Sequence, residues 1–324
     1  MADLLRETVR AAAEDGADWR ALGEQLGVLG LAVPERWGGS GAGLGEAAVV
    51  AEELGAVLAS VPFVSTVVAA RLLVESGDDA ACADLLPGLC DGSRTFAVAS
   101  LPTGVDRPAG TAEGVVDGPG ATDLLVLAGD GLFHVDGAAA EVVPVPTLDL
   151  TRPQADITFA ETPARRLGPA APATDVAVTL LAAELVGVAR TMLDTAVTYA
   201  RERVQFGRPI GSFQAVKHRC ADMLVELELA RSVAEHAART HDHGGDDPAL
   251  ASSLAHVVAT DAARRVTGDA IQVLGGVGIT WEHPAHRYYK RAVTSAALWG
   301  GRAHRDRLAK LAIDGNDGRS SHAG

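Results

Sequence analysis

The long helical period in the second half of the chain constrains the fold more than any other feature. From Thr174 to about Ile313, apolar residues recur at intervals of three and four, the spacing of one helix face. The expected helices are Val176–Arg203, Phe213–Thr240, Pro248–Leu274 and Pro284–Ala312, with breaks inside the last. Aromatic residues make up only 4% of the chain, and Ala, Leu and Val dominate. We therefore expect the helices to pack closely through small side chains.

Two further zones precede this helical part. Residues 3–75 also read as helical, and Pro62 is expected to begin a helix over Val64–Glu75. Between residues 95 and 164 the pattern changes to short β-type runs separated by Gly, Pro and Asp. These runs are Thr95–Ala99, Asp123–Leu127, Leu132–Val135, Val142–Val145 and Asp156–Phe159.

The order of the zones predicts an α+β fold. It consists of an N-terminal helical domain at residues 1–92, a small middle β domain at 93–168 and a C-terminal four-helix bundle at 169–315. Residues 316–324 are polar and are expected to form a frayed tail.

Charge and composition argue against several classes of protein. The chain carries 28 Lys and Arg against 42 Asp and Glu, a net charge of −14, so phosphate backbones and anionic membranes would repel it. No apolar run approaches the roughly 20 residues of a membrane span. The N-terminus reaches charged residues at once and lacks a signal-peptide core. Three scattered cysteines fit buried thiols in a reducing cytoplasm.

Two motifs carry a family resemblance. Residues 203–214 read R-V-Q-F-G-R-P-I-G-S-F-Q, and residues 272–284 read Q-V-L-G-G-V-G-I-T-W-E-H-P. They resemble the R-x-x-F-G-x-x-I-x-x-F-Q and Q-x-x-G-G-x-G signatures of the acyl-CoA dehydrogenase family, the second followed by E-x-P. The segment Leu29–Gly39 is similar to the family's G-L-x-x-P-E-x-x-G-G pattern. The resemblance covers the chain from about residue 15 to about residue 312.

The resemblance implies that this chain contacts FAD held by a neighbouring subunit. An arginine at a helix end offers a fixed, charged donor fork that suits a diphosphate. Paired glycines let a backbone approach a ligand closely. The implied cofactor contacts are Arg203, Gln205, Phe213, Gln214, Gln272, Val273, Leu274, Gly275 and Gly276.

The half of the site that family members use for their own flavin looks eroded. Where relatives carry a T-E-P-type segment, residues 99–104 read A-S-L-P-T-G, so Ser100 could replace the hydroxyl while Leu101 replaces the acid. Where relatives carry an aromatic-I-T segment, residues 114–118 read G-V-V-D-G, with Val115 at the aromatic position.

The catalytic base that the family needs is also missing. Dehydrogenation requires a carboxylate to take the α-proton while the flavin takes the β-hydride. The two positions where relatives place this Glu correspond to Trp299 and Ala177. Asp175 and Glu184 lie near the second position but out of register, and Glu282 reads as structural. We therefore assign no catalytic residue to this chain.

His241 and His243 are the only pair of residues that invites a metal assignment. They lie in a Gly- and Asp-rich segment without a nearby third ligand, which is usual for a solvated turn, so no metal is expected. Cys220 falls on the apolar side of its predicted helix and reads as a core residue.

The sequence keeps the residues that would contact a neighbour's flavin, but it lacks those that family members use to hold their own flavin. This combination resembles the shorter subunits of actinobacterial heteromeric acyl-CoA dehydrogenases. The resemblance implies an α2β2 enzyme with two flavins, acting on a CoA thioester such as a steroid side chain. A second, more complete subunit would hold flavin and base, and electron-transfer flavoprotein would accept the electrons. Two alternatives stay open: a homo-oligomeric dehydrogenase with an unusual base such as Asp175 or Glu184, and a flavin-free scaffold.

Overall fold

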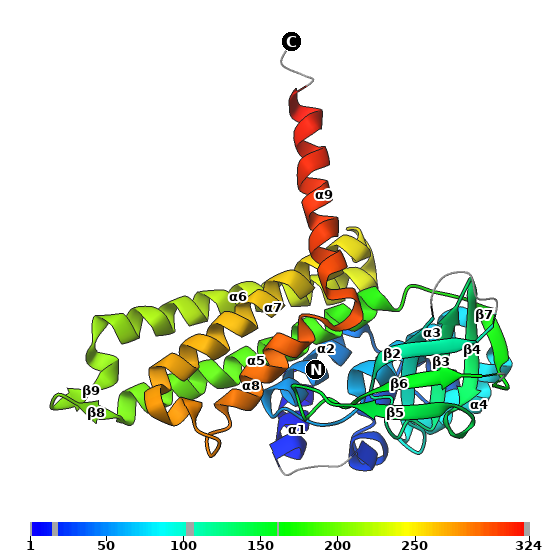
Figure 1. Cartoon of the computed structure of the whole chain (residues 1–324), viewed down its shortest axis with the longest axis horizontal. Helices are drawn as coiled ribbons and strands as arrows, with labels where there is room; N and C mark the ends of the chain where they lie inside the picture. The colour runs from blue at the N-terminus through cyan, green and yellow to red at the C-terminus, as the bar shows by residue number, and fades with distance from the viewer. Residues whose placement is uncertain (1, 15–18, 102–106, 161, 321–324) are drawn as a thin grey trace. The chain divides into compact units, whose positions relative to one another are not determined.

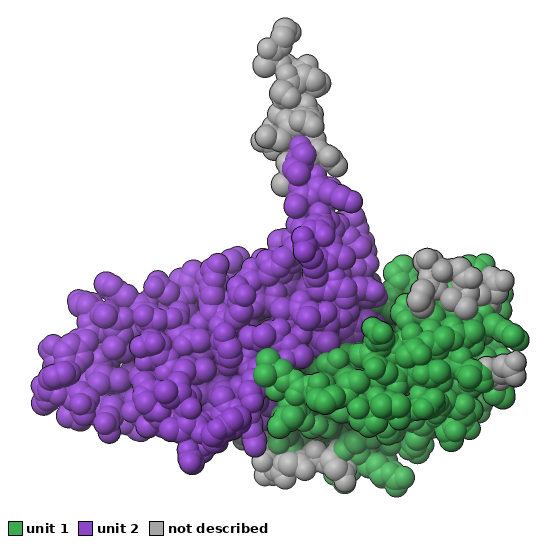
Figure 2. Space-filling model, viewed as in Figure 1, with its two compact units in different colours: residues 1–54, 59–173 green, residues 55–58, 174–324 purple. Residues whose placement is uncertain are grey.

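A computed structural model describes residues 2–14, 19–101, 107–160 and 162–320. The chain forms two compact units, which Figure 2 distinguishes by colour. Unit 1 comprises residues 1–54 and 59–173, and unit 2 comprises residues 55–58 and 174–324. Each unit is described by itself below.

Unit 1 begins with helices. They are α1 (Ala2–Glu14), α2 (Leu44–Ala56), α3 (Phe63–Ser76) and α4 (Asp79–Cys90), with short turns η1 (Ala21–Gln25), η2 (Val28–Gly30) and η3 (Glu35–Trp37). Pro62 immediately precedes α3, as predicted. Asp78 caps α4, because its side chain accepts a hydrogen bond from the Ala81 N–H at 2.9 Å. Helix α3 is buried around most of its circumference, as expected of a core helix.

The rest of unit 1 is built on two small sheets. The strands are β1 (Phe96–Ser100), β2 (Gly110–Val116), β3 (Asp123–Ala128), β4 (Gly131–Asp136), β5 (Glu141–Val145), β6 (Gln154–Phe159) and β7 (Arg165–Pro169), with the turn η4 (Gly137–Ala139) between β4 and β5. One sheet has the order β1-β3-β4-β7 and the other β2-β6-β5. Strands β1 and β3 are parallel, and all other pairs are antiparallel. Pro144 is tolerated because β5 is an edge strand.

One apolar core joins the two sheets. Val126 and Phe133 from the first sheet and Ile157 and Phe159 from the second belong to the same buried cluster. Side chains of two sheets that share one core form a sandwich. The outer face of the first sheet is also covered, since β1 and β3 are buried on both faces and α3 packs against β1. The β part of unit 1 is therefore a small sandwich of the size that the sequence predicts.

Unit 2 is helical. Its helices are α5 (Thr174–Glu202), α6 (Gln214–His243), α7 (Pro248–Leu274), α8 (Ala285–Ser295) and α9 (Gly301–Ser320). The connections are the hairpin β8 (Val204–Gln205) and β9 (Arg208–Pro209), and the turns η5 (Ile210–Ser212), η6 (Gly275–Ile279) and η7 (Leu298–Gly300). Helices α5, α6 and α7 run side by side, and α9 projects from the unit (Figure 1).

Small residues fill the centre of unit 2. Its buried cluster contains many alanines, among them Ala189 and Ala196 on α5 and Ala255 and Ala262 on α7. Small side chains let helix axes approach closely, as the alanine-rich composition predicts. By length and hydropathy α5 could cross a membrane, but 89% of its most apolar window is buried in the protein, as in many core helices.

The α+β fold and the four predicted bundle helices are confirmed, and the expected break in the last one falls between α8 and α9. Two expectations were wrong. Helix α6 continues to His243, so His241 and His243 lie in its last turn and not in a loop. Helix α9 continues to Ser320, beyond the predicted start of the tail at residue 316. The division into three domains by residue number stays a prediction.

Candidate functional site

The first predicted cofactor segment, residues 203–214, connects α5 to α6 through a short hairpin. Arg203 directly follows α5, and its backbone N–H donates to the carbonyl of Tyr199 at 2.8 Å. The turn between β8 and β9 is Phe206-Gly207, with φ values of 53° and 75°. Two successive positive φ values are typical of a type I′ turn, whose twist matches that of the flanking strands. The turn fixes the direction in which Phe206 projects.

Aromatic contacts fasten this hairpin to the first turn of α6. The rings of Phe206 and Phe213 meet edge to face with centroids 6.1 Å apart. The Arg208 guanidinium lies 4.1 Å from the centre of the Phe213 ring. Phe206 is nevertheless 91% exposed. An aromatic side chain that is held in place yet open to solvent marks a surface that a ligand or partner can cover.

The polar side chains of this segment face solvent. Arg203, Gln205 and Gln214 are all exposed. The Gln205 amide donates to the carbonyl of Val204 at 2.8 Å, which ties it to its own hairpin. Within the described ranges, the Arg203 guanidinium makes no hydrogen bond or ion pair with this chain. It is therefore available to an anionic ligand from outside the chain.

The second segment, residues 272–276, forms the end of α7. Gln272, Gly275 and Gly276 are exposed, whereas Val273 and Leu274 are buried in the bundle core at 8% and 3% exposure. Gly275 has φ of 62°, and no atom lies within 4 Å of where a Cβ of Gly275 or Gly276 would stand. The backbone here is thus open to a ligand. Val273 and Leu274 can reach such a ligand only through their backbone.

The two segments come together at one end of unit 2 (Figure 1). An open groove of about 470 Å³ has Glu202, which precedes Arg203, on one side and Leu274, inside the second segment, on the other. Its remaining lining residues are Thr191, Asp194, Thr195, Thr198, Tyr199 and His283. An exposed guanidinium, exposed amides and an uncovered glycine backbone lie at this end of unit 2 (Figure 1), and groups of this kind suit a dinucleotide such as FAD.

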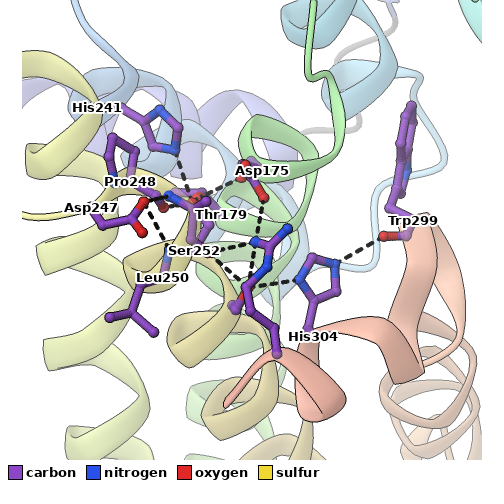
Figure 3. A network of polar contacts seen from close by, with 12 residues as sticks. Asp175, Thr179, His241, Asp247, Pro248, Leu250, Ser252, Trp299 and His304 are labelled. Atoms are coloured by element: carbon purple, nitrogen blue, oxygen red, sulfur yellow. Dashed lines mark hydrogen bonds and ion pairs between the residues drawn. The ribbon is translucent and has the colours of Figure 1, made fainter. Parts of the chain in front are cut away.

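Trp299, at the first position where relatives carry the base, lies in a sharply bent turn. Its backbone is left-handed, with φ 50° and ψ 45°. Its carbonyl accepts a hydrogen bond from His304 Nε2 at 3.1 Å (Figure 3). The Nδ1 of His304 lies 3.0 Å from the hydroxyl oxygen of Ser253, which donates its own proton to the carbonyl of Ala249. An indole at this position can take no proton from a substrate carbon.

A buried histidine supports the same turn. His256 is 1% exposed and contacts the His304 ring edge to face, with centroids 5.1 Å apart. Burial, together with the charges of His304 and Arg305, lowers the pKa of His256 to about 4. His256 is therefore neutral at physiological pH and serves packing.

The second base position also lacks a usable acid. Ala177 is fully buried on α5. Asp175 pairs with Arg307 at 3.2 Å (Figure 3). Glu184 pairs with Arg291 at 2.6 Å, with side chains 7% and 2% exposed. A buried carboxylate locked to a guanidinium holds the fold together and is not free to abstract a proton.

Glu282 differs from the structural role predicted for it. Its side chain is exposed and makes no hydrogen bond or ion pair with any residue that the structure describes. The neighbouring Trp281 is 78% exposed and packs against His286 and the Lys290 ammonium. The Glu282 segment is therefore part of the open surface of unit 2 and not of its core.

Of the positions of unit 1 that correspond to the family's own flavin segments, Ser100 is polar and exposed, whereas Leu101 and Val115 are buried and apolar. Ser100 is exposed at the end of β1, while Leu101 is buried in the sandwich core. Pro102, Thr103 and Gly104 lie outside the described residues. Val115 is also in that core. Asp117 accepts a hydrogen bond from the Ser65 hydroxyl at 2.6 Å.

A second polar cluster of unit 1 has a structural role. Asp123 accepts hydrogen bonds from His134 at 2.7 Å and Thr122 at 2.8 Å, and it pairs with Arg94 at 3.3 Å. Burial opposes ionisation of Asp123, but these three partners outweigh it and keep the pKa of Asp123 below its usual value.

The histidines of α6 and the three cysteines have structural surroundings. His241 bonds the Ser252 hydroxyl at 2.9 Å (Figure 3). Among the described residues, no three His, Cys, Asp or Glu side chains are grouped as metal ligands. Cys82 and Cys90 are buried thiols, as predicted, and Cys220 is half-buried against the bundle core. Phe206 is an exposed aromatic residue of the first segment that the sequence analysis did not single out, although the phenylalanine of the R-x-x-F-G signature marks it.

Two family models match the N-terminal and the C-terminal helical parts of the chain. The model described as acyl-CoA dehydrogenase, N-terminal domain, matches residues 2–93, and the model described as acyl-CoA dehydrogenase, C-terminal domain, matches residues 174–310. Acyl-CoA dehydrogenase IpdE2 of Mycolicibacterium smegmatis is 39% identical over 310 residues, covering 94% of this chain and 91% of that protein.

Solved structures give the same result. The steroid ACAD variant Tcur3481-Tcur3483 superposes with a TM-score of 0.87 at 33% identity, covering 98% of each chain. The ChsE4-ChsE5 complex from Mycobacterium tuberculosis superposes with a TM-score of 0.87 at 27% identity, covering 96% of this chain and 97% of that one.

Proposed function

Because this chain belongs to the acyl-CoA dehydrogenase family, we propose that it is one subunit of a heteromeric, FAD-dependent member of it. In this proposal, side chains of this chain contact an FAD that is bound by a second, more complete subunit. The complex, of α2β2 composition, removes the α and β hydrogens of a CoA thioester. The partner subunit carries the base.

The exposed array at one end of unit 2 carries this proposal. Arg203, Gln214 and Gln272 face solvent, and the Gly275-Gly276 backbone lies open beside them. Polar groups in such number, unpaired with their own chain, suit a ligand that another chain presents. The guanidinium and the amides would bind and orient the diphosphate and adenosine half of FAD. Bound FAD supplies the acceptor for the substrate hydride.

The base positions support a division of labour between subunits. Trp299 and Ala177 can take no proton, and Asp175 and Glu184 are ion-paired. A homo-oligomeric enzyme that uses one of these two carboxylates would first have to break its ion pair. This chain therefore orients the cofactor, and the partner moves the proton.

Substrate and acceptor follow from similarity to relatives. One similar structure is named as a steroid ACAD, and another is named as a complex of two proteins, ChsE4 and ChsE5. We accordingly propose the CoA thioester of a steroid side chain as substrate, and electron-transfer flavoprotein as the electron acceptor of a cytoplasmic enzyme. A flavin-free scaffold subunit is the alternative that the experiment below would reveal.

Co-expression with a longer acyl-CoA dehydrogenase homologue encoded next to this chain tests the proposal. We expect a stable heterotetramer that carries two flavins, one for each partner subunit. A complex that forms without any flavin would support the scaffold role instead. A yellow, active homo-oligomer of this chain alone would contradict the proposal.

A further inference from the structure

The β8–β9 hairpin presents three exposed polar side chains on one face. Gln205 and Arg208 lie opposite each other in its ladder, so their side chains project from the same side. The ladder continues by one hydrogen bond, in which the Ile210 N–H donates to the carbonyl of Arg203 at 2.8 Å. Because side chains alternate along a strand, Arg203 shares the face of Gln205 and therefore that of Arg208. Arg203 and Gln205 are predicted contacts of FAD, whereas the R-x-x-F-G-x-x-I signature leaves position 208 unspecified.

Arg208 carries a charge that the described part of this chain does not neutralise. Its side chain is exposed, and it makes no ion pair or hydrogen bond with any residue in the described ranges. Its guanidinium instead lies 4.1 Å from the centre of the Phe213 ring. Contact with the face of a ring holds a guanidinium in place but satisfies none of its N–H donors. Arg208 is therefore positioned on the hairpin with its hydrogen-bonding capacity unused.

We propose that Arg208 is a further phosphate-binding residue, which acts together with Arg203 on the diphosphate of FAD. The two arginines are diagonal neighbours in the ladder, and such neighbours have Cα atoms about 7–8 Å apart, within reach of long side chains. Two guanidinium groups at this spacing can meet the two phosphates of one diphosphate, each through charge-assisted hydrogen bonds. Arg208 binds and orients the cofactor and moves no proton. This inference rests on the proposed function.

The test compares three single variants in the co-expressed complex. Arg208→Met keeps an unbranched apolar chain against Phe213 and removes the charge. Arg208→Lys keeps the charge but replaces the planar fork by a single ammonium. Arg201→Met is the matched control, because it removes an exposed arginine from the last turn of α5. Rebinding of FAD to each deflavinated complex is titrated by flavin fluorescence at low and at high ionic strength, and the melting temperature of each complex is measured.

We expect Arg208→Met to raise the dissociation constant of FAD by about tenfold or more at low ionic strength, because a charge-assisted contact is lost. The melting temperature should stay that of wild type, and the difference in affinity should shrink at high ionic strength, since salt screens the lost attraction. Arg208→Lys should bind FAD with intermediate affinity, and Arg201→Met should bind it like wild type. Combining Arg208→Met with Arg203→Ala should give an effect that differs from the product of the two single effects, because both residues bind one group.

Four outcomes would overturn the inference, and they differ in what else they affect. Wild-type FAD affinity in Arg208→Met, beside a loss in Arg203→Ala, would remove Arg208 from the site and leave the trans contact standing. Unchanged FAD affinity with a raised KM for the acyl-CoA substrate would assign Arg208 to the phosphates of CoA. A lower melting temperature in both Arg208 variants, with a loss of FAD that salt does not change, would show that Arg208 only braces the hairpin. If even the wild-type complex binds no FAD, the proposed function fails, and this inference fails with it.

Discussion

Arg203 is the residue on which the proposed trans contact with FAD depends most. Its guanidinium is exposed and unpaired within the described chain, so it can offer its whole donor fork to a diphosphate. We expect Arg203→Ala to weaken FAD retention of the assembled complex by about 1.5–3 kcal/mol. Fluorescence of the released flavin measures this loss.

A neighbouring arginine provides the matched control. Arg201 is also exposed, two residues earlier in the last turn of α5. Arg201→Ala removes the same charge without removing a predicted contact, and it should retain FAD like wild type. Equal retention in both variants would show that Arg203 makes no special contact.

His256 makes the stability of the protein depend on pH. Its pKa falls to about 4 in the folded protein, because burial disfavours the imidazolium. In the unfolded chain it titrates near 6.5, so the unfolded state binds more protons between these values. The contribution of neutral His256 to the free energy of unfolding is therefore complete above pH 6.5. The free energy of unfolding should fall by up to about 3 kcal/mol as the pH is lowered toward 4.

Denaturant unfolding across this pH window tests the assignment. His256→Leu keeps the volume of the side chain and removes its titration, so most of the pH dependence in the window should vanish. Asp123 contributes separately at lower pH, because its depressed pKa means that its stabilising charge is lost only there. An unchanged slope in the Leu variant would mean that another group titrates.

Sequence alone identified the exposed polar residues of the site but not every side-chain orientation. Arg203, Gln214 and Gln272 were recognisable because a motif fixes their types and spacing. Val273 and Leu274 were included with that run, yet both side chains point into the core. Which member of a run faces solvent depends on the packing of α7, which the motif does not record.

Among the elements, the long helices and five of the strands of unit 1 were predictable, whereas strands β2 and β7 were not. Helices α5, α6 and α7 each repeat their apolar period over many turns, which makes the signal strong. Strand β2 contains two glycines and a register shift between Ala112 and Val115, which breaks the alternation. Strand β7, R-R-L-G-P, is short and polar at an edge. Helix α4 was missed, and it contains Pro87, which weakens any helical reading.

A substitution in the β8–β9 hairpin should change the melting temperature and FAD retention in opposite directions. Phe206 adopts a left-handed φ of 53°, which a β-carbon disfavours and which asparagine tolerates best among non-glycine residues. Phe206→Asn should therefore keep or raise the melting temperature, by roughly 1–3 °C. It should also weaken FAD retention, because the exposed aromatic surface is lost.

Thermal unfolding and flavin release, measured on the same variant, distinguish the two effects. The tyrosine variant Phe206→Tyr keeps the aromatic ring and should retain FAD. A variant Phe206→Asn that holds FAD as firmly as wild type would mean that Phe206 only supports the hairpin.

At the level of the whole molecule, unit 2 exposes several large apolar side chains. Leu224, Val225 and Leu229 on α6 are 49%, 67% and 51% exposed, and Ile279 and Trp281 are more exposed still. A partner that covers these side chains would remove their apolar surface from water. We expect the chain expressed alone to be colourless and poorly soluble, and co-expression with its partner to raise its soluble yield. A soluble, yellow product from this chain alone would contradict this expectation.

The proposed division of labour between two subunits rests on the absence of a base at positions 177 and 299 of this chain. Removing a true general base costs a factor of roughly 100 to 10,000 in rate. Asp175→Asn, Glu184→Gln and Glu282→Gln should each change turnover by less than about tenfold in the assembled complex. Glu184→Gln should also lower stability by about 3–5 kcal/mol, because it leaves Arg291 buried without its counter-charge.

Turnover per bound flavin in the assembled complex tests the central claim most directly. Expressing the rate per flavin separates a catalytic loss from lost assembly or stability. The three variants of this chain should turn over within about tenfold of wild type, and removing the partner subunit's glutamate at the position of Trp299 should abolish turnover. If one of the three variants loses turnover while its FAD stays bound, this chain carries its own base and the account is wrong.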